Sequence, residues 1–343
     1  MRILGRLLKA IGLLVLAIVM FTIIWWFWPA KTPAIDSTPE GRSISQIEYV
    51  KIGGVEQCIL IRSHDTRNPI LLFLHGGPGM PMMYLGYKFQ RPLEKYFTVV
   101  QWDRRGAGKT FYHNKPTAES MSTRQLIDDA YALIDTLRTR FEQRQVILVG
   151  HSFGTHLGSI MANERPELFS HYISIGQVVD NKKARVLQER FIREQAGLKE
   201  RVEVITALDS IKNVDFESWL FEFGGELKAS RSFFPLIWTG VRAPEYKLSE
   251  AVAVAKGSSF SSAHMKHNVL SGSIYEEVME YQVPVYFLVG RWDYTTPHQL
   301  ITEYYKHLQA PQKELIFFEN SAHFPFFEEP DQFCEVVIRL INK

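Results

Sequence analysis

The chain has 343 residues, of which 46% are hydrophobic and 22% charged, a composition typical of a globular protein with a sizeable core. Its formal net charge is +2 and the body of the protein has no Lys/Arg-rich run, so nothing indicates nucleic acid as a partner. The only two cysteines, Cys58 and Cys334, lack the spacing of a metal site or redox motif. We expect both to be small buried apolar residues, with a disulfide between them as the alternative.

The N-terminus is an apolar stretch with positive charges in front of it. Arg2, Arg6 and Lys9 precede an uncharged run from Ala10 to Ala30, which ends in a cluster of tryptophans. About 20 apolar residues can cross a bilayer as a helix, and tryptophan is enriched at membrane interfaces. We therefore expect residues 1–30 to form a single-pass anchor in the cell membrane, with the remaining, folded part of the chain extracytoplasmic. A cleaved signal peptide is the alternative, although bulky aromatic residues stand where small ones would be needed.

The remaining chain alternates between apolar runs and helical patterns. Residues 31–45 contain two prolines and several small polar residues, and are expected to form a linker. Two alternating segments joined by a Gly-Gly pair predict a hairpin, 46–52 with 56–62. Continuous apolar runs predict further strands at 69–76, 97–103, 145–150, 171–176, 283–290 and 313–319. Helical patterns lie at 122–141, 153–164, 297–308 and 330–341. This alternation indicates an α/β fold with a mostly parallel sheet covered by helices on both faces.

One long stretch, 177–275, interrupts this alternation. It is charged, aromatic and helical in pattern, and it contains no clear buried strand. We expect it to be a helical cap inserted into an α/β core formed by residues 46–176 and 276–343.

Three chemically notable side chains each follow a predicted strand: Ser152, Asp293 and His323. Functional residues of parallel sheets gather at the carboxyl ends of the strands. A serine hydroxyl becomes a good nucleophile when a histidine takes its proton and a carboxylate orients that histidine. The order Ser, Asp, His along the chain is the order found in the α/β-hydrolase fold. The sequence therefore predicts a catalytic triad that works through an acyl-enzyme.

The serine lies between Gly150 and Gly154, in a Gly-x-Ser-x-Gly pattern. Small flanking residues allow a sharp strand-to-helix bend that exposes the serine. The pattern alone is common, and a tight structural turn is the alternative. Negative charge on an attacked carbonyl needs hydrogen-bond donors. We expect these to be the backbone N–H groups of Phe153 and of Gly76 or Gly77.

Five collinear segments resemble the proline iminopeptidase group of α/β-hydrolases from about residue 45 to the C-terminus. They are HGGPG (75–79), WDRRGAGKT (102–110), GHSFG (150–154), GRWDYTTP (290–297) and SAHFPFFEEP (321–330). The resemblance implies an α/β-hydrolase fold and a serine peptidase that removes N-terminal residues, often proline. It also implies Ser152, Asp293 and His323 as the triad and the 75–79 loop as the oxyanion hole. Arg104 and Thr110 replace a glutamine and a serine of the family pattern, in a segment expected to be scaffold.

Substrate contacts are expected from the cap. Members of the group hold the free amine of the substrate with acids in a Trp- and Glu-containing cap motif. The segment 216–226 offers Trp219, Glu222 and Glu226, and we expect Trp219 and Glu222 to contact the substrate. The expected function is that of an aminopeptidase of proline iminopeptidase type, acting on small peptides. A carboxylesterase or other small-acyl hydrolase on the same fold is the alternative, and a non-catalytic binding protein would usually lack a triad residue.

No metal or cofactor is expected. His264 and His267 have a spacing that can bind metal, but no further ligands are apparent nearby. His151 precedes the serine and is expected to be structural, because a second base there would point the wrong way. The oligomeric state is left open.

Overall fold

A computed structural model describes residues 2–27, 30–36, 41–210, 216–270 and 273–342. Within these residues an eight-stranded sheet has the order β1-β2-β4-β3-β5-β6-β7-β8. The strands are β1 (Ile44–Ile52), β2 (Val55–Ser63), β3 (Ile70–Leu74), β4 (Thr98–Asp103), β5 (Val146–His151), β6 (Phe169–Ile175), β7 (Val285–Gly290) and β8 (Lys313–Phe318). The first three strands in the sheet order pair antiparallel, and all later pairs are parallel. The predicted mostly parallel α/β fold is confirmed.

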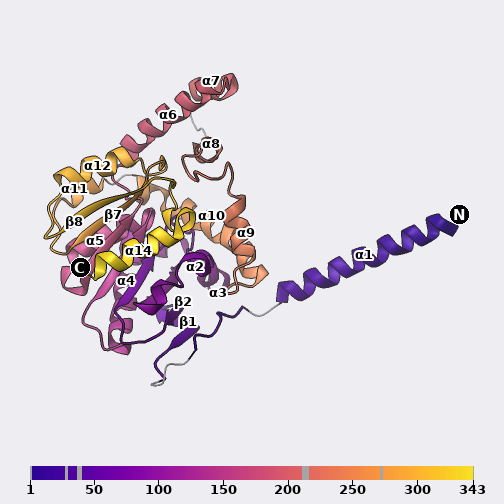
Figure 1. Ribbon diagram of the computed structural model, residues 1–343, viewed down its shortest axis with the longest axis horizontal. Helices are drawn as coiled ribbons and strands as arrows, with labels where there is room; N and C mark the ends of the chain where they lie inside the picture. Colours follow the sequence, from indigo (N-terminus) through magenta and orange to yellow (C-terminus); the bar gives the residue numbers. More distant parts are fainter. Residues whose placement is uncertain (1, 28–29, 37–40, 211–215, 271–272, 343) are drawn as a thin grey trace.

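Helices cover both faces of the sheet, as the alternation of apolar runs and helical patterns predicts (Figure 1). On one face, alternate residues of β3 pack with α4 (Thr123–Arg140), α5 (Phe153–Glu164) and α12 (His298–His307). On the other, Leu71 and Phe73 of β3 pack with α2 (Met83–Phe89) and α14 (Pro330–Ile341). Successive side chains of a strand point to opposite faces, so a sheet buried on both sides needs a continuous apolar run. Cys58 and Cys334 are buried free thiols in the apolar core between the sheet and helices α2 and α14.

Short helices connect the main elements. They are α3 (Gly108–His113), α13 (Pro325–Glu328), η1 (Leu93–Lys95), η2 (Ala118–Ser120) and η3 (Pro166–Leu168). Helix α3 begins next to the end of β4, where the Asp103 carboxylate accepts a 2.7 Å hydrogen bond from the Lys109 N–H. This contact fixes the turn that leads the chain out of the sheet.

The chain between β6 and β7 is helical. It contains α6 (Asn181–Leu198), α7 (Val202–Ser210), α8 (Phe216–Phe223), α9 (Phe234–Val241), α10 (Leu248–Leu270) and α11 (Ile274–Glu277). Helices α6, α7 and α8 bury a small apolar cluster of their own, which includes Phe191, Val204 and Leu220. In Figure 1, α6 and α7 lie at the top and α8 and α9 at the right of the sheet.

The N-terminal stretch differs from the expectation. Helix α1 (Arg2–Phe27) ends before the uncharged run does, and Trp28 and Pro29 lie outside the described residues. Across the described ranges, no helix is both long and apolar enough to span a membrane. The predictions of a transmembrane anchor at residues 1–30 and of an extracytoplasmic catalytic domain in the cell membrane are therefore wrong.

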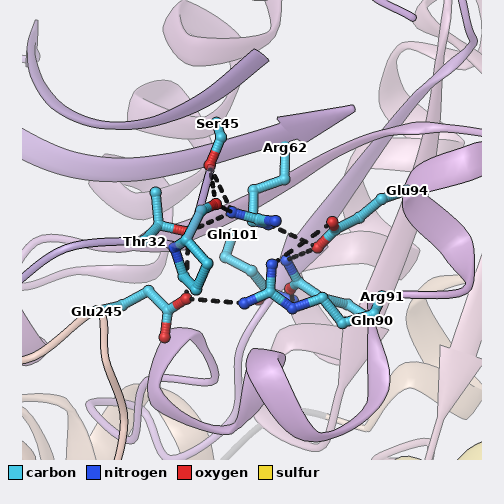
Figure 2. A network of polar contacts seen from close by, with 9 residues as sticks. Thr32, Ser45, Arg62, Gln90, Arg91, Glu94, Gln101 and Glu245 are labelled. Carbon is cyan, nitrogen blue, oxygen red and sulfur yellow. Dashed lines mark hydrogen bonds and ion pairs between the residues drawn. The ribbon is translucent and has the colours of Figure 1, made fainter. Parts of the chain in front are cut away.

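A buried ion pair ties the segment after α1 to the sheet (Figure 2). Arg62 on β2 donates a 2.8 Å hydrogen bond from Nε to Glu94, and both side chains are 2% exposed. The other side of the guanidinium binds Thr32 and further oxygens of the N-terminal segment, those of Pro33 and Ser45. Arg91 bridges Glu94 to Glu245 in the loop before α10, at 3.7 and 3.5 Å. Because a buried charge is costly unless it is paired, this network fixes residues 32–33 against the body of the protein.

Candidate active site

Ser152 occupies a strained bend between β5 and α5. Its backbone has φ 52° and ψ −123°. Residues other than glycine rarely adopt a positive φ. The neighbouring glycines allow this geometry. A Cβ at Gly154 would lie 2.0 Å from the Leu74 carbonyl oxygen, and one at Gly150 would lie 2.7 Å from the Gly154 carbonyl oxygen. Strain of this kind is typical of functional sites, where the surrounding structure holds it in place.

Replacing Gly154 by alanine should therefore destabilise the fold. The new methyl group would meet backbone atoms that cannot move freely, and such overpacking typically costs about 1–3 kcal/mol. Gly197 in α6 is the matched control, because a Cβ there meets nothing within 4 Å, and its change to alanine should stabilise the helix by about 0.5–1 kcal/mol. Denaturant-induced unfolding of both variants measures the difference. Equal stability of Gly154→Ala and the wild type would contradict the close approach.

His323 and Asp293 form a buried hydrogen-bonded pair. Nδ1 of His323 lies 2.8 Å from Oδ2 of Asp293. Thr296 donates to the same carboxylate twice, from its N–H and its hydroxyl, each at 2.8 Å. These contacts hold the carboxylate in position and direct the Nδ1 proton of His323 toward it. The other ring nitrogen, Nε2, is then the one with a lone pair available to act as a base.

The surroundings of His323 favour its protonated form. Burial alone would lower the pKa of His323, but the charge and hydrogen bond of Asp293 and the charge of Glu226 outweigh burial and raise the pKa to about 9. An imidazole that has accepted a proton is therefore stabilised at this position.

The sheet order brings the predicted catalytic residues to one edge. Ser152 and His323 line a single pocket of about 300 Å³ together with Gly76 and Gly77. Because β3 lies beside β5, the loop after β3 is next to Ser152. Because β7 lies beside β8, Asp293 is next to His323. Phe153 begins α5, and the first N–H groups of a helix have no partner within it.

Arg104 binds the loop of residues 75–79 that follows β3, here called the glycine loop. The side chain is buried, and its Nη2 donates to the carbonyl oxygens of His75 at 2.6 Å, Gly76 at 3.3 Å and Pro78 at 3.2 Å. Burial lowers the pKa of Arg104 to about 9. Two of its nitrogens, Nε and Nη1, find no hydrogen-bond partner among the described residues. The segment 102–110 was expected to be only scaffold. The one signal in the sequence for a contact of Arg104 with the glycine loop was its position as a charged residue directly after an apolar strand.

Two acids also line the pocket, Glu226 and Glu217. Glu226 is 5% exposed, and Thr295 donates a hydrogen bond to its carboxylate. Burial is the main cause that raises the pKa of Glu226 to about 8, while the nearby His323 lowers it. The backbone oxygen of Glu226 accepts a 3.0 Å hydrogen bond from the N–H of His323. A carboxylate therefore stands within the same pocket as the base.

Trp219 and Glu222, predicted as substrate contacts, do not line this pocket. Glu222 forms an ion pair with Arg201, and Trp219 packs against the apolar cluster of α6, α7 and α8. The reason is helical periodicity, since residues three and four apart share a face of α8. Phe216, Glu217 and Leu220 face the pocket, while positions 219 and 222 face elsewhere. The start and end of α8 could not be read from the sequence, so the face that α8 turns toward the pocket could not be predicted.

The remaining candidates have structural surroundings. His151 is buried, and its Nε2 lies 2.9 Å from the backbone oxygen of His323. Burial and the neighbouring His323 hold the pKa of His151 well below its usual value, so this ring stays neutral. Asp103, the other possible acid, bonds to Lys109 and Tyr246 and not to His323. Over the described residues, no three His, Cys, Asp or Glu side chains are grouped to hold a metal ion.

Comparison with known proteins gives consistent matches. A family model described as the alpha/beta hydrolase fold matches residues 69–330. The probable aminopeptidase YbaC of Bacillus subtilis (strain 168) is 31% identical over 312 residues, covering 88% of this chain and 98% of that protein. A proline iminopeptidase of Heyndrickxia coagulans is 25% identical over 280 residues, covering 79% and 90%. The crystal structure of a proline iminopeptidase from Mycobacterium smegmatis aligns with a TM-score of 0.64 at 17% identity, over 87% of this chain and 98% of that chain. The structural likeness supports the fold, and the sequence matches confirm the resemblance read from the five segments.

Proposed function

The chain belongs to the α/β-hydrolase fold family, and from this premise we propose that it is a serine aminopeptidase of proline iminopeptidase type. The observation that carries this proposal is the pocket that Ser152, His323 and Glu226 share. It combines a nucleophile, a base held by a carboxylate, and a separate buried acid that can pair with a substrate amine. In this proposal residues 177–275 form a cap over a core of 46–176 and 276–343, because α8 contributes to the pocket wall.

The proposed reaction begins with attack of Ser152 on the carbonyl carbon of the first peptide bond. Nε2 of His323 takes the hydroxyl proton as the new C–O bond forms, and Asp293 stabilises the resulting imidazolium. The carbonyl oxygen gains negative charge, which the N–H groups of Phe153 and of Gly76 or Gly77 stabilise. The C–N bond then breaks, and His323 returns the proton to the departing amine. Water attacks the acyl-enzyme by the same route and releases the N-terminal residue.

Recognition of a free N-terminus follows from the charge of the pocket. A protonated amine beside Glu226 would form a charge-assisted hydrogen bond in a site largely shielded from water. The buried carboxyl has its pKa raised to about 8, and a bound ammonium group would favour its ionised form. Glu217 and the cationic Arg185 line the same pocket, so the amine contact is assigned to Glu226.

The experiment that tests this proposal compares three chromogenic substrates, two that release p-nitroaniline and one that releases p-nitrophenol. These are a free aminoacyl p-nitroanilide with proline or leucine, its N-acetylated counterpart, and p-nitrophenyl acetate. We expect turnover of the free amine to exceed that of the acetylated form by at least about tenfold, the value of one charge-assisted hydrogen bond. Equal turnover of both amides, or hydrolysis of the ester alone, would contradict an aminopeptidase and support the esterase alternative.

The change Glu226→Gln should weaken binding of free-amine substrates. Loss of one hydrogen bond to a charged group costs about 1.5–3 kcal/mol, or roughly 10- to 100-fold in KM. Hydrolysis of p-nitrophenyl acetate, which has no amine, should change by only a few fold. Glu222→Gln is the matched control, since Glu222 pairs with Arg201 away from the pocket. A larger effect of Glu222→Gln than of Glu226→Gln would overturn the assignment of the amine contact.

The pH dependence of ester hydrolysis should report His323. Only the neutral ring can accept a proton, and its pKa is raised to about 9, so kcat/KM should fall as the pH drops below this value. Glu226 is one of the groups that raise the pKa of His323, so Glu226→Gln should move the acidic limb to lower pH. Initial rates of p-nitrophenyl acetate hydrolysis between pH 6 and 10 measure the acidic limb of the wild type and that of Glu226→Gln. If the acidic limb lies at the same pH in Glu226→Gln and in the wild type, Glu226 does not influence the pKa of His323.

A further inference from the structure

A second cavity, of about 550 Å³, lies between α9 and α10 and is here called the apolar chamber. Its walls include Leu236 and Ile237 of α9 and Ala251 and Val254 of α10. Tyr246 also contributes, but its hydroxyl is already bonded to Asp103. Ser258, Ser259 and Glu217 also line the cavity, but most of its lining is apolar, which favours an apolar occupant.

The apolar chamber adjoins the pocket of Ser152. Met80, Tyr84, Glu217 and Phe233 line both cavities. These four side chains lie between the two cavities, and a substrate held at Ser152 would enter the chamber past them. Glu217 is the one charged residue of this shared wall. The other three residues are a flexible methionine, Met80, and two aromatic residues, Tyr84 and Phe233.

The side of the substrate that enters the chamber follows from the position of the base. The leaving group must lie near His323, which returns the proton to it. His323 and Phe324 line the catalytic pocket but not the chamber. The chamber begins instead at Met80, which follows the glycine loop that faces the carbonyl oxygen. The group that points into the chamber is therefore attached to the acyl side of the scissile bond.

We propose that the apolar chamber binds an extended apolar group on the acyl side of the substrate and selects for its length. This inference rests on the proposed serine hydrolase function. In a peptide the group is the side chain of the N-terminal residue, whose amine lies near Glu226. In an ester it is the acyl chain. The chamber is larger than a proline ring requires, so the preferred N-terminal residue is bulky and apolar.

The test uses the full chain and two substrate series with straight apolar groups of increasing length. One series consists of p-nitroanilides of alanine, norvaline, norleucine and 2-aminooctanoic acid. The other consists of p-nitrophenyl esters from acetate to octanoate. Each buried methylene should raise kcat/KM about three- to fourfold until the chamber is filled. A flat dependence on length in both series would overturn the inference, even where turnover itself shows that the enzyme works.

Two variants separate the chamber from general effects on α10. Ala251→Phe fills the chamber, and its loss of kcat/KM should grow with the length of the apolar group. Ala263→Phe makes the same change at an exposed position of α10 outside both cavities and should leave the length dependence intact. Equal losses at every length in Ala251→Phe would overturn the inference. Length dependence in the ester series without turnover of the anilides would keep the chamber and reject the aminopeptidase, whereas no turnover in either series rejects both.

Discussion

Replacing Ser152 by alanine is expected to lower kcat by about 10⁴- to 10⁶-fold, the range found when a member of a serine triad is removed. The remaining rate would come from substrate binding and the oxyanion donors alone. The fold should persist, because alanine keeps the Cβ that serine already carries at φ 52°. The side chain is also half-buried at the pocket wall rather than packed in the core. The measurements are kcat with the free aminoacyl p-nitroanilide and the midpoint of thermal unfolding.

A covalent probe makes this result independent of the choice of substrate. A fluorophosphonate should add to the wild type at Ser152, as detected by intact mass and peptide mapping, and should leave Ser152→Ala unmodified. Labelling of the variant at the same rate as the wild type would place the nucleophile elsewhere. Lack of labelling in the wild type would favour a non-catalytic binding protein over a hydrolase.

The sheet could be predicted from the sequence because its strands are buried on both faces. The apolar run at 145–150 became β5 (Val146–His151), and the run at 283–290 became β7 (Val285–Gly290). In each case the boundaries differ by no more than two residues, since apolar side chains on both faces leave no other stable position for the segment. The helices α2 (Met83–Phe89) and α3 (Gly108–His113) were not predicted. They are too short for the 3.6-residue period to appear in the pattern.

The candidate site could be predicted only in part. That Ser152, Asp293 and His323 lie near one another could be predicted, because each follows a strand and parallel strands end at one edge. The substrate side could not be derived in this way, since the acids of 216–226 depend on which face α8 turns to the pocket. Arg104 was assigned to scaffold because the sequence does not show which carbonyl groups a buried guanidinium reaches. The anchor expected at residues 1–30 was wrong, because among the described residues no helix is both long and apolar enough to span a membrane.

Arg104→Met is expected to lower kcat by about 100-fold, an effect comparable to loss of one oxyanion donor. Arg104 binds the carbonyl oxygens of His75, Gly76 and Pro78. Because Arg104 holds the carbonyl oxygens of the loop, the N–H groups of the loop remain free to face the substrate. In the proposed mechanism Arg104 therefore positions the oxyanion donors without touching the substrate. Arg104→Gln is the matched control, because an amide keeps two donors and has the side chain of the family pattern. It should retain part of the rate.

The readout that separates positioning from a general loss of structure is affinity for a charged transition-state analogue. A boronic acid that forms a tetrahedral adduct with Ser152 should bind Arg104→Met about 100-fold more weakly, in step with the fall in kcat/KM. An alkylamine that lacks the carbonyl group makes no use of the oxyanion hole and should bind equally well to both proteins. Added guanidinium should restore part of the rate in Arg104→Ala, where the space is open. If the boronic acid and the alkylamine lose affinity equally, or if guanidinium has no effect while thermal stability falls, Arg104 is a packing residue and the glycine loop keeps its geometry by other means.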